Sequence, residues 1–173
     1  MPKKIVFIDT EIGIEDRKIH DIGAIRSDKT VFHSSSLHDF YNFISDSEFV
    51  CGHNIIHHDL KYLPLNSHQA NKYKPIDTLY LSPLLFPKRP YHSLLKNDKI
   101  ITEELNNPVN DSIKAANLFY DEVSAFHALS KQMQQILDKM GMTKFFGEIA
   151  INPEMLYIKA ISDNVKISSD NFS

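Results

Sequence analysis

Cysteine and net positive charge are scarce in this chain. Of its 173 residues only Cys51 is a cysteine, which excludes an internal disulfide and any zinc site built from several cysteines. The net charge is −3, so no overall positive field indicates nucleic-acid binding. A metal-dependent nuclease can act without such a field, because bound cations supply local positive charge.

Long hydrophobic runs are also missing. No run has the length of a transmembrane helix, and residues 1–10 lack the layout of a signal peptide, so we expect a cytoplasmic protein with no membrane partner. Hydrophobic residues make up 42% of the chain and charged residues 24%, which is typical of a globular domain. We predict one domain at residues 1–141 and a C-terminal extension or linker at residues 142–173.

The order of the predicted elements indicates an α/β fold. Residues 4–34 contain three apolar runs joined by short turns, which predicts a three-stranded antiparallel meander. Residues 37–44 have apolar side chains at helical spacing, and Ser36 is their candidate N-cap. Strand and helix patterns then alternate, with short strands at 48–52 and 75–77, which predicts parallel additions to the sheet. Together these patterns predict a mixed five-stranded sheet flanked by helices.

Two acids stand at the end of the first predicted strand. Residues 5–8 are consecutive apolar residues, which predicts a strand buried on both faces. The two-residue period of a strand then puts Asp9 and Glu11 on one face. Neighbouring carboxylates at a buried strand end repel each other unless a cation lies between them, and hard oxygen ligands suit Mg²⁺ or Mn²⁺. The alternative is a strand that simply ends in solvated acids.

Two further acids stand at predicted helix starts. Asp59 begins a helix that is predicted to run to about residue 65. Asp111 begins a long helix that is predicted to end at Gly141, and it falls on the same face as the apolar stripe of that helix. A carboxylate at the head of an inward-facing stripe needs a partner. The alternative for Asp111 is an N-cap or a first-turn acid that interacts with the helix dipole.

These acids and their neighbours resemble the motifs of the DnaQ-like, or DEDD, 3′→5′ exonuclease superfamily. Asp9-Thr10-Glu11 matches the first motif, and Gly52-His53-Asn54 followed by Asp59 matches the second. Ile76-Asp77-Thr78-Leu79 resembles the stretch that commonly follows, and Asp111 matches the closing acid of the third motif. The resemblance implies a ribonuclease-H-like fold.

By this resemblance the protein is expected to hydrolyse phosphodiester bonds at DNA 3′ ends with two Mg²⁺ or Mn²⁺ ions. Asp9 would bridge the ions, Glu11 and Asp111 would complete one site, and Asp59 would hold the other ion. The substrate-binding residues that the resemblance implies are Thr10, Ile12, His53 and Asn54. For His53 the alternative is a structural hydrogen bond within its own turn.

One position departs from the family pattern. Family members have a His five residues, or a Tyr four residues, before the last acid, where it orients or deprotonates the attacking water. This chain has Asn106 and Asn107 at those positions. An amide cannot act as a general base, although it can orient a water, so the expected enzyme is slow unless another imidazole supplies the base. Three histidines are candidates, each of which is otherwise a surface or structural residue: His57, His58 and His92.

The segment around Asn106 and the run from Pro83 to Tyr91 also resemble the exonuclease-like segment that precedes RecQ-type DNA helicases. This narrower resemblance implies a covalently linked helicase as partner. It favours a second hypothesis, a catalytically degenerate module that binds nucleic acid, which Asn106 supports and the missing basic field opposes. A third hypothesis is an unrelated α/β protein whose strand-end acids are solvated.

Overall fold

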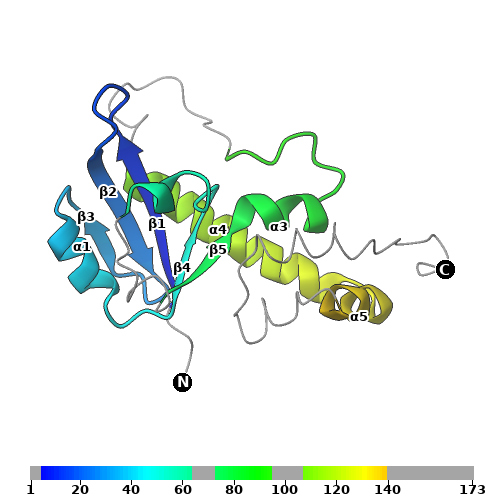
Figure 1. Ribbon diagram of the computed structural model, residues 1–173. Coiled ribbons are helices and arrows are strands. Elements are labelled where there is room, and N and C mark those ends of the chain that lie inside the picture. Colours follow the sequence, from blue (N-terminus) through cyan, green and yellow to red (C-terminus); the bar gives the residue numbers. More distant parts are fainter. Residues whose placement is uncertain (1–4, 64–72, 95–106, 140–173) are drawn as a thin grey trace.

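The computed structural model describes residues 5–63, 73–94 and 107–139 (Figure 1). Within them, one mixed sheet has the strand order β3-β2-β1-β4-β5. Its strands are β1 (Ile5–Ile12), β2 (Ile19–Arg26), β3 (Val31–His33), β4 (Phe49–Gly52) and β5 (Lys74–Asp77). The first three strands pair antiparallel, whereas β4 is parallel to β1 and β5 is parallel to β4. The predicted α/β fold, with an antiparallel meander followed by parallel strands, is confirmed.

β1 lies at the centre of the sheet and is buried from both faces. Its residues 5–8 are at most 6% exposed, as the apolar run predicts. On one side β1 pairs with β2 along nearly its whole length. On the other side its pairing with β4 ends at Phe7. The end of β1 that carries Asp9 and Glu11 therefore extends beyond β4.

Helices cover both faces of the sheet. One face packs against α1 (Leu37–Ile44), and the other packs against α3 (Thr78–Leu85), α4 (Pro108–Ala128) and α5 (Lys131–Lys139). The side chains of β1 alternate between these two cores, with Val6 and Ile8 on the α1 side and Phe7 on the α4 side. Asp9 and Glu11 continue the face of Phe7, so the strand period directs them towards α4.

The N-cap of α1 is the one that the sequence predicts. The Ser36 side chain accepts a hydrogen bond from the Asp39 backbone N–H at 3.2 Å. Phe40 and Ile44 on the predicted apolar face are buried. Local capping and helical spacing therefore suffice to explain this helix.

The long helix predicted from Asp111 to residue 140 is two helices, so the prediction of one helix is wrong. α4 begins three residues before Asp111, and α5 follows it after a short break. Leu129 has extended backbone with ψ 154°, and the Ser130 hydroxyl accepts a hydrogen bond from the Met133 N–H at 3.2 Å. The apolar stripe continues through the break, so helical spacing alone does not reveal it.

The start of α4 lies directly on β2 at Gly23. A Cβ at Gly23 would lie 2.1 Å from backbone atoms of Pro108 and Val109, so any larger residue would force the helix away. Gly23 also pairs with Asp9 across the β1–β2 ladder. This close approach therefore brings the first turn of α4 next to the acidic end of β1.

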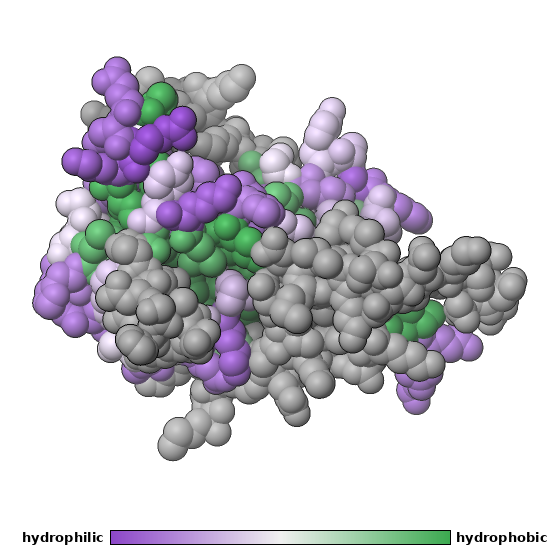
Figure 2. All heavy atoms as spheres, in the orientation of Figure 1, coloured by the Kyte–Doolittle hydropathy of each residue, from purple (hydrophilic) through white to green (hydrophobic). Residues whose placement is uncertain are grey.

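Hydrophilic side chains gather over the loop between β1 and β2, at the upper left of Figure 2. Residues 15–18 of this loop are all charged and exposed. Ile14 is the exception there, with 92% of its surface exposed. None of the described helices is long and apolar enough to cross a membrane.

Candidate active site

Asp59 is tied directly to the end of β1. Its Oδ1 accepts one hydrogen bond from the Thr10 backbone N–H at 2.8 Å and another from the Thr10 hydroxyl at 2.7 Å. Asp59 is only 1% exposed, and it opens a short 3-10 helix, η1 (Asp59–Lys61). This element is shorter than the predicted helix, whose expected end at residues 64–65 lies outside the described residues. A buried carboxylate needs such donors, because burial without them is costly.

Asp111 reaches the site from the first turn of α4. The helix begins with Pro108 at its first position, and the Asn107 side chain caps it by accepting from the Val109 N–H at 2.9 Å. Asn107, not Asp111, is therefore the N-cap. The Asp111 Oδ1 accepts a charge-assisted hydrogen bond from the Lys114 Nζ at 3.0 Å.

The four acids are close enough to interact electrostatically at Asp9. The pKa of Asp9 is raised to about 8 by burial and, in decreasing order of size, by the negative charges of Asp59, Asp111 and Glu11, whereas His58 acts to lower it. A proton on Asp9 therefore relieves the repulsion at neutral pH. A bound cation would relieve it equally well, because it would replace that proton.

The chemistry of these side chains fits a hard divalent cation. Four carboxylates from β1, η1 and α4 supply the oxygen ligands that Mg²⁺ and Mn²⁺ prefer. Among the described residues, however, no group of three or more His, Cys, Asp or Glu side chains is gathered closely enough to hold a metal ion. The fit thus rests on donor type and charge, and occupation of the site requires these side chains to move closer together.

His58 is the candidate histidine that lies beside the acids. Its Nδ1 is 3.7 Å from the Asp59 Oδ2. The interaction with Asp59 raises the pKa of His58, and the charges of Asp9 and Glu11 act in the same direction. Asn106, which stands where the family has its base, lies outside the described residues.

The other two candidate histidines contact hydroxyl groups of α3. His57 is hydrogen bonded to the Tyr80 hydroxyl, and the His92 Nδ1 is 2.9 Å from the Ser82 hydroxyl. Neither His57 nor His92 contributes to the pKa shift of Asp9. Of the three candidates, His58 is therefore the one that the structure brings to the acids.

The predicted substrate-binding residues lie at two places, Thr10 and Ile12 at the end of β1, and His53 and Asn54 in the turn after β4. Thr10 is 2% exposed and directs its hydroxyl to Asp59, and Ile12 ends β1 in a partly exposed position.

The His53 Nδ1 is 2.8 Å from the Thr78 hydroxyl, while its buried Nε2 has no hydrogen-bond partner among the described residues. Burial, with a smaller effect of His92, lowers the pKa of His53 to about 4, so its imidazole is neutral. The hydrogen bond of His53 is thus made to α3 and is not the one within its own turn that the alternative expected.

Asp77 organises the turn that carries the second motif, a role that sequence reasoning missed. Its carboxylate accepts hydrogen bonds from the backbone N–H groups of Asn54 at 2.8 Å, Ile56 at 3.1 Å and Leu79 at 3.0 Å. Asn54 has a φ of 63°, a left-handed conformation that Asn tolerates better than most residues. The sequence feature that could have indicated this role is the position of Asp77 just before a helix, which is typical of an N-cap.

Comparisons of the chain with protein-family models, curated proteins and solved structures found no match. The resemblance to the exonuclease superfamily therefore stays a prediction, and so do the roles of Thr10, Ile12, His53 and Asn54 in substrate binding.

Proposed function

We propose that this protein is a divalent-metal-dependent 3′→5′ exonuclease of ribonuclease-H-like fold that acts on DNA 3′ ends. The observation that carries the proposal is that Asp59, Asp111 and Glu11 lie near enough to Asp9 for their charges to help raise its pKa. Acids from three separate elements repel one another when they share a partly buried site. A site for divalent cations would give the fold a reason to keep these acids near one another.

Each acid has a distinct place in the proposed mechanism. Asp9 would contact both ions, Glu11 and Asp111 would complete one site, and Asp59 would hold the second ion. When bound, two such ions make a water nucleophilic at neutral pH and stabilise the charge that develops on the leaving 3′ oxygen. The two Thr10 donors hold the Asp59 carboxyl group in place.

A lysine and a histidine next to the acids support the same proposal. Lys114 is paired with Asp111, and His58 lies near Asp59. Both would be released from these carboxylates when metal ions take their place. Positive charge would then be available at the edge of the site for the phosphates of a DNA strand.

The proposal is tested by following 5′-labelled DNA oligonucleotides in Mg²⁺ or Mn²⁺. We expect stepwise shortening from the 3′ end by the wild-type protein and no shortening by Asp9→Asn. The matched control is Asp39→Asn, which removes an exposed acid from α1 and should leave the rate unchanged. Equal shortening by the wild-type protein and Asp9→Asn, or none by either, would refute the proposal.

A second candidate function is a degenerate exonuclease module that binds nucleic acid for a covalently linked RecQ-type helicase. The observation that favours it is the 3.0 Å ion pair between Asp111 and Lys114, which neutralises one of the four acids without a metal. Tight oligonucleotide binding without product over long incubation would favour this module. Hydrolysis that depends on Asp9 would exclude it.

A further inference from the structure

Residues 53–58 form the turn between β4 and η1 and lead to Asp59. The turn starts very close to β1, since a Cβ at Gly52 would lie 2.9 Å from the Ile8 carbonyl oxygen and 3.1 Å from the Ile55 Cβ. Asn54 then has a φ of 63°. A residue other than glycine keeps such a left-handed conformation only where the contacts around it hold it there.

Asp77 supplies these contacts from the end of β5. Its side chain is fully buried. Its Oδ1 accepts a hydrogen bond from the Asn54 N–H at 2.8 Å, and its Oδ2 accepts one from the Ile56 N–H at 3.1 Å. The same Oδ1 accepts from the Leu79 N–H at 3.0 Å and so caps α3. One buried carboxyl group therefore joins the start of α3 to two separate peptide groups of the turn.

Thr78 holds the same turn at its beginning. Its hydroxyl donates a hydrogen bond to the Gly52 carbonyl oxygen at 3.3 Å and lies 2.8 Å from the His53 Nδ1. Like Asp77, Thr78 is fully buried. The last residue of β5 and the first residue of α3 thus hold the turn together.

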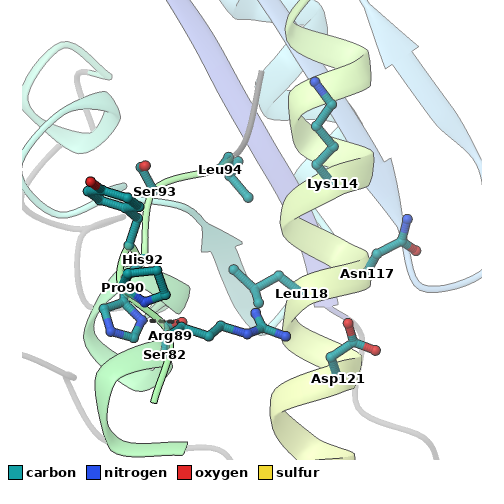
Figure 3. A pocket seen from close by; sticks show the side chains of 11 residues that line it. Ser82, Arg89, Pro90, His92, Ser93, Leu94, Lys114, Asn117, Leu118 and Asp121 are labelled. Carbon is teal, nitrogen blue, oxygen red and sulfur yellow. Dashed lines mark hydrogen bonds between the residues drawn. The ribbon is translucent and has the colours of Figure 1, made fainter. Parts of the chain in front are cut away.

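α3 is itself held in place by packing and by a buried hydrogen bond. Leu81 and Leu85 belong to the same core as Phe119 of α4. Ser82 is 1% exposed, and its hydroxyl lies 2.9 Å from the His92 Nδ1. Figure 3 shows this pair joining α3 to the loop after it, beside a cavity of about 540 Å³ between that loop and α4. The start of α3 is therefore a fixed point for the turn.

The backbone of the turn carries this position on to Asp59. The Asn54 carbonyl oxygen accepts a hydrogen bond from the His58 N–H at 2.9 Å, and the Ile55 carbonyl oxygen accepts one from the Leu60 N–H at 3.0 Å. These two bonds tie the residues directly before and after Asp59 to the part of the turn that Asp77 holds. Ile55 is also fully buried, in the core on the α1 side of the sheet.

We propose that Asp77 is a positioning residue for Asp59, which it holds where the Asp59 carboxyl group reaches Thr10 at the end of β1. Asp77 acts through the turn and not as a metal ligand, because both of its oxygens already accept hydrogen bonds from backbone N–H groups. The effect of Asp77 on the place of Asp59 is independent of the proposed function, whereas its effect on metal affinity rests on that function.

Two substitutions of Asp77 test the proposal. Asp77→Asn keeps the shape of the side chain but turns one oxygen into an NH₂ group, which faces a backbone N–H whichever oxygen it replaces. Asp77→Ser can still cap α3 but lacks the second oxygen that holds the turn, and it decides the test where Asp77→Asn does not fold. Ser36→Ala is the matched control, because it destabilises the protein at the N-cap of α1 and leaves every hydrogen bond of the turn in place.

Amide hydrogen exchange in the metal-free protein, followed by NMR, measures the place of Asp59, because the Thr10 N–H donates to it at 2.8 Å. Phe7, in the part of β1 that is paired on both sides, reports opening of the whole sheet. We expect both Asp77 variants to speed exchange at Thr10 relative to Phe7 by about 10-fold or more, and Ser36→Ala to leave this ratio unchanged. Equal acceleration at the two amides, or an unchanged rate at Thr10, would overturn the proposal.

Calorimetric titration with Mn²⁺ separates this proposal from the proposed function. We expect both Asp77 variants to raise the Kd for Mn²⁺ by about 10–100-fold, which is typical of residues that orient metal ligands, and Ser36→Ala to bind like wild type. Mn²⁺ binding by wild type, with an unchanged Kd and unchanged Thr10 exchange in the Asp77 variants, would refute the role of Asp77 alone. No Mn²⁺ binding by wild type, with faster Thr10 exchange in the variants, would refute the proposed function alone.

Discussion

Asp59 accepts both of its hydrogen bonds from Thr10 on the same oxygen, Oδ1, at 2.8 Å from the backbone N–H and 2.7 Å from the hydroxyl. β4 stops pairing with β1 at Phe7, so Asp59 takes the position of a strand partner at Thr10. The arrangement joins the first and second acidic motifs without a metal. It also leaves the Asp59 Oδ2, which lies 3.7 Å from His58, as the atom for a further ligand.

Replacing Thr10 by Val should therefore weaken both the fold and the site. Val keeps the shape and the backbone donor but removes the hydroxyl donor, leaving the buried Asp59 carboxyl group with one hydrogen bond fewer. We expect a loss of about 1–3 kcal/mol in the free energy of unfolding. Urea denaturation measures it, with Thr10→Ser as the control that keeps the hydroxyl. Equal stability of Thr10→Val and wild type would contradict this role of Thr10.

Gly23→Ala should separate α4 from β2. The added Cβ would meet the backbone of Pro108 and Val109 at 2.1 Å, so the helix start must shift and carry Asp111 with it. We expect a destabilisation of about 1–3 kcal/mol together with weaker Mn²⁺ binding. Ser27→Ala, at an exposed position after β2, is the control and should change neither quantity. Unchanged Mn²⁺ affinity in folded Gly23→Ala would show that this contact does not position Asp111.

His58→Ala should slow DNA hydrolysis more than His57→Ala does. His58 lies beside the Asp59 Oδ2, whereas His57 is hydrogen bonded to Tyr80 away from the acids. Side chains that orient metal-binding carboxylates typically contribute about 10–100-fold, so we expect a loss of that size for His58→Ala alone. The initial rate of oligonucleotide shortening at saturating Mn²⁺ measures it. Identical rates for the two variants would remove His58 from the mechanism.

Glu122 makes the stability of the protein depend on pH. Its carboxyl is fully buried, and its two oxygens have no hydrogen-bond partner among the described residues. Burial and, to a smaller extent, the charge of Asp77 raise its pKa from 4.5 to about 9. The folded protein therefore keeps a proton that the unfolded chain releases above pH 4.5, so this contribution to stability is fully present below pH 4.5 and is lost as the pH rises to 9.

Glu122→Gln should remove this dependence, because the amide stays neutral at every pH. We expect the variant to gain stability over wild type as the pH rises from 4.5 to 9, by up to about 1.4 kcal/mol per pH unit. Thermal unfolding of both proteins across this range provides the measurement. A difference in stability that does not change with pH would show that Glu122 is ionised in the folded state.

The sheet and α1 could be predicted because their signals are local. An apolar run gives the buried β1, and Ser36 followed by helical spacing gives α1. The break after α4 could not be predicted in this way, because its apolar stripe continues into α5. The break forms because the Ser130 hydroxyl accepts a hydrogen bond from the Met133 N–H and caps a new helix, which competes with continuation of α4.

The acids of the site could be predicted, but what holds them together could not. Asp9, Asp59 and Asp111 each stand at the end of an element, which sequence patterns indicate. The Gly23 contact with α4 joins residues that are far apart in the sequence, and so do the hydrogen bonds that Asp77 accepts from Asn54 and Ile56. Neither contact produces a repeating pattern in the sequence, so neither could be predicted from it.

The proposed function requires the four acids to form a divalent-cation site. This is measured by calorimetric titration of the metal-free protein with Mn²⁺ at pH 7.0 and above, beside Asp9→Asn and the control Asp39→Asn, because binding does not depend on the rate of hydrolysis. We expect saturable binding by wild type and Asp39→Asn, proton release on binding because Asp9 has a pKa of about 8, and loss of binding in Asp9→Asn. Mn²⁺ binding that is equally weak, or equally strong, in wild type and Asp9→Asn would contradict it.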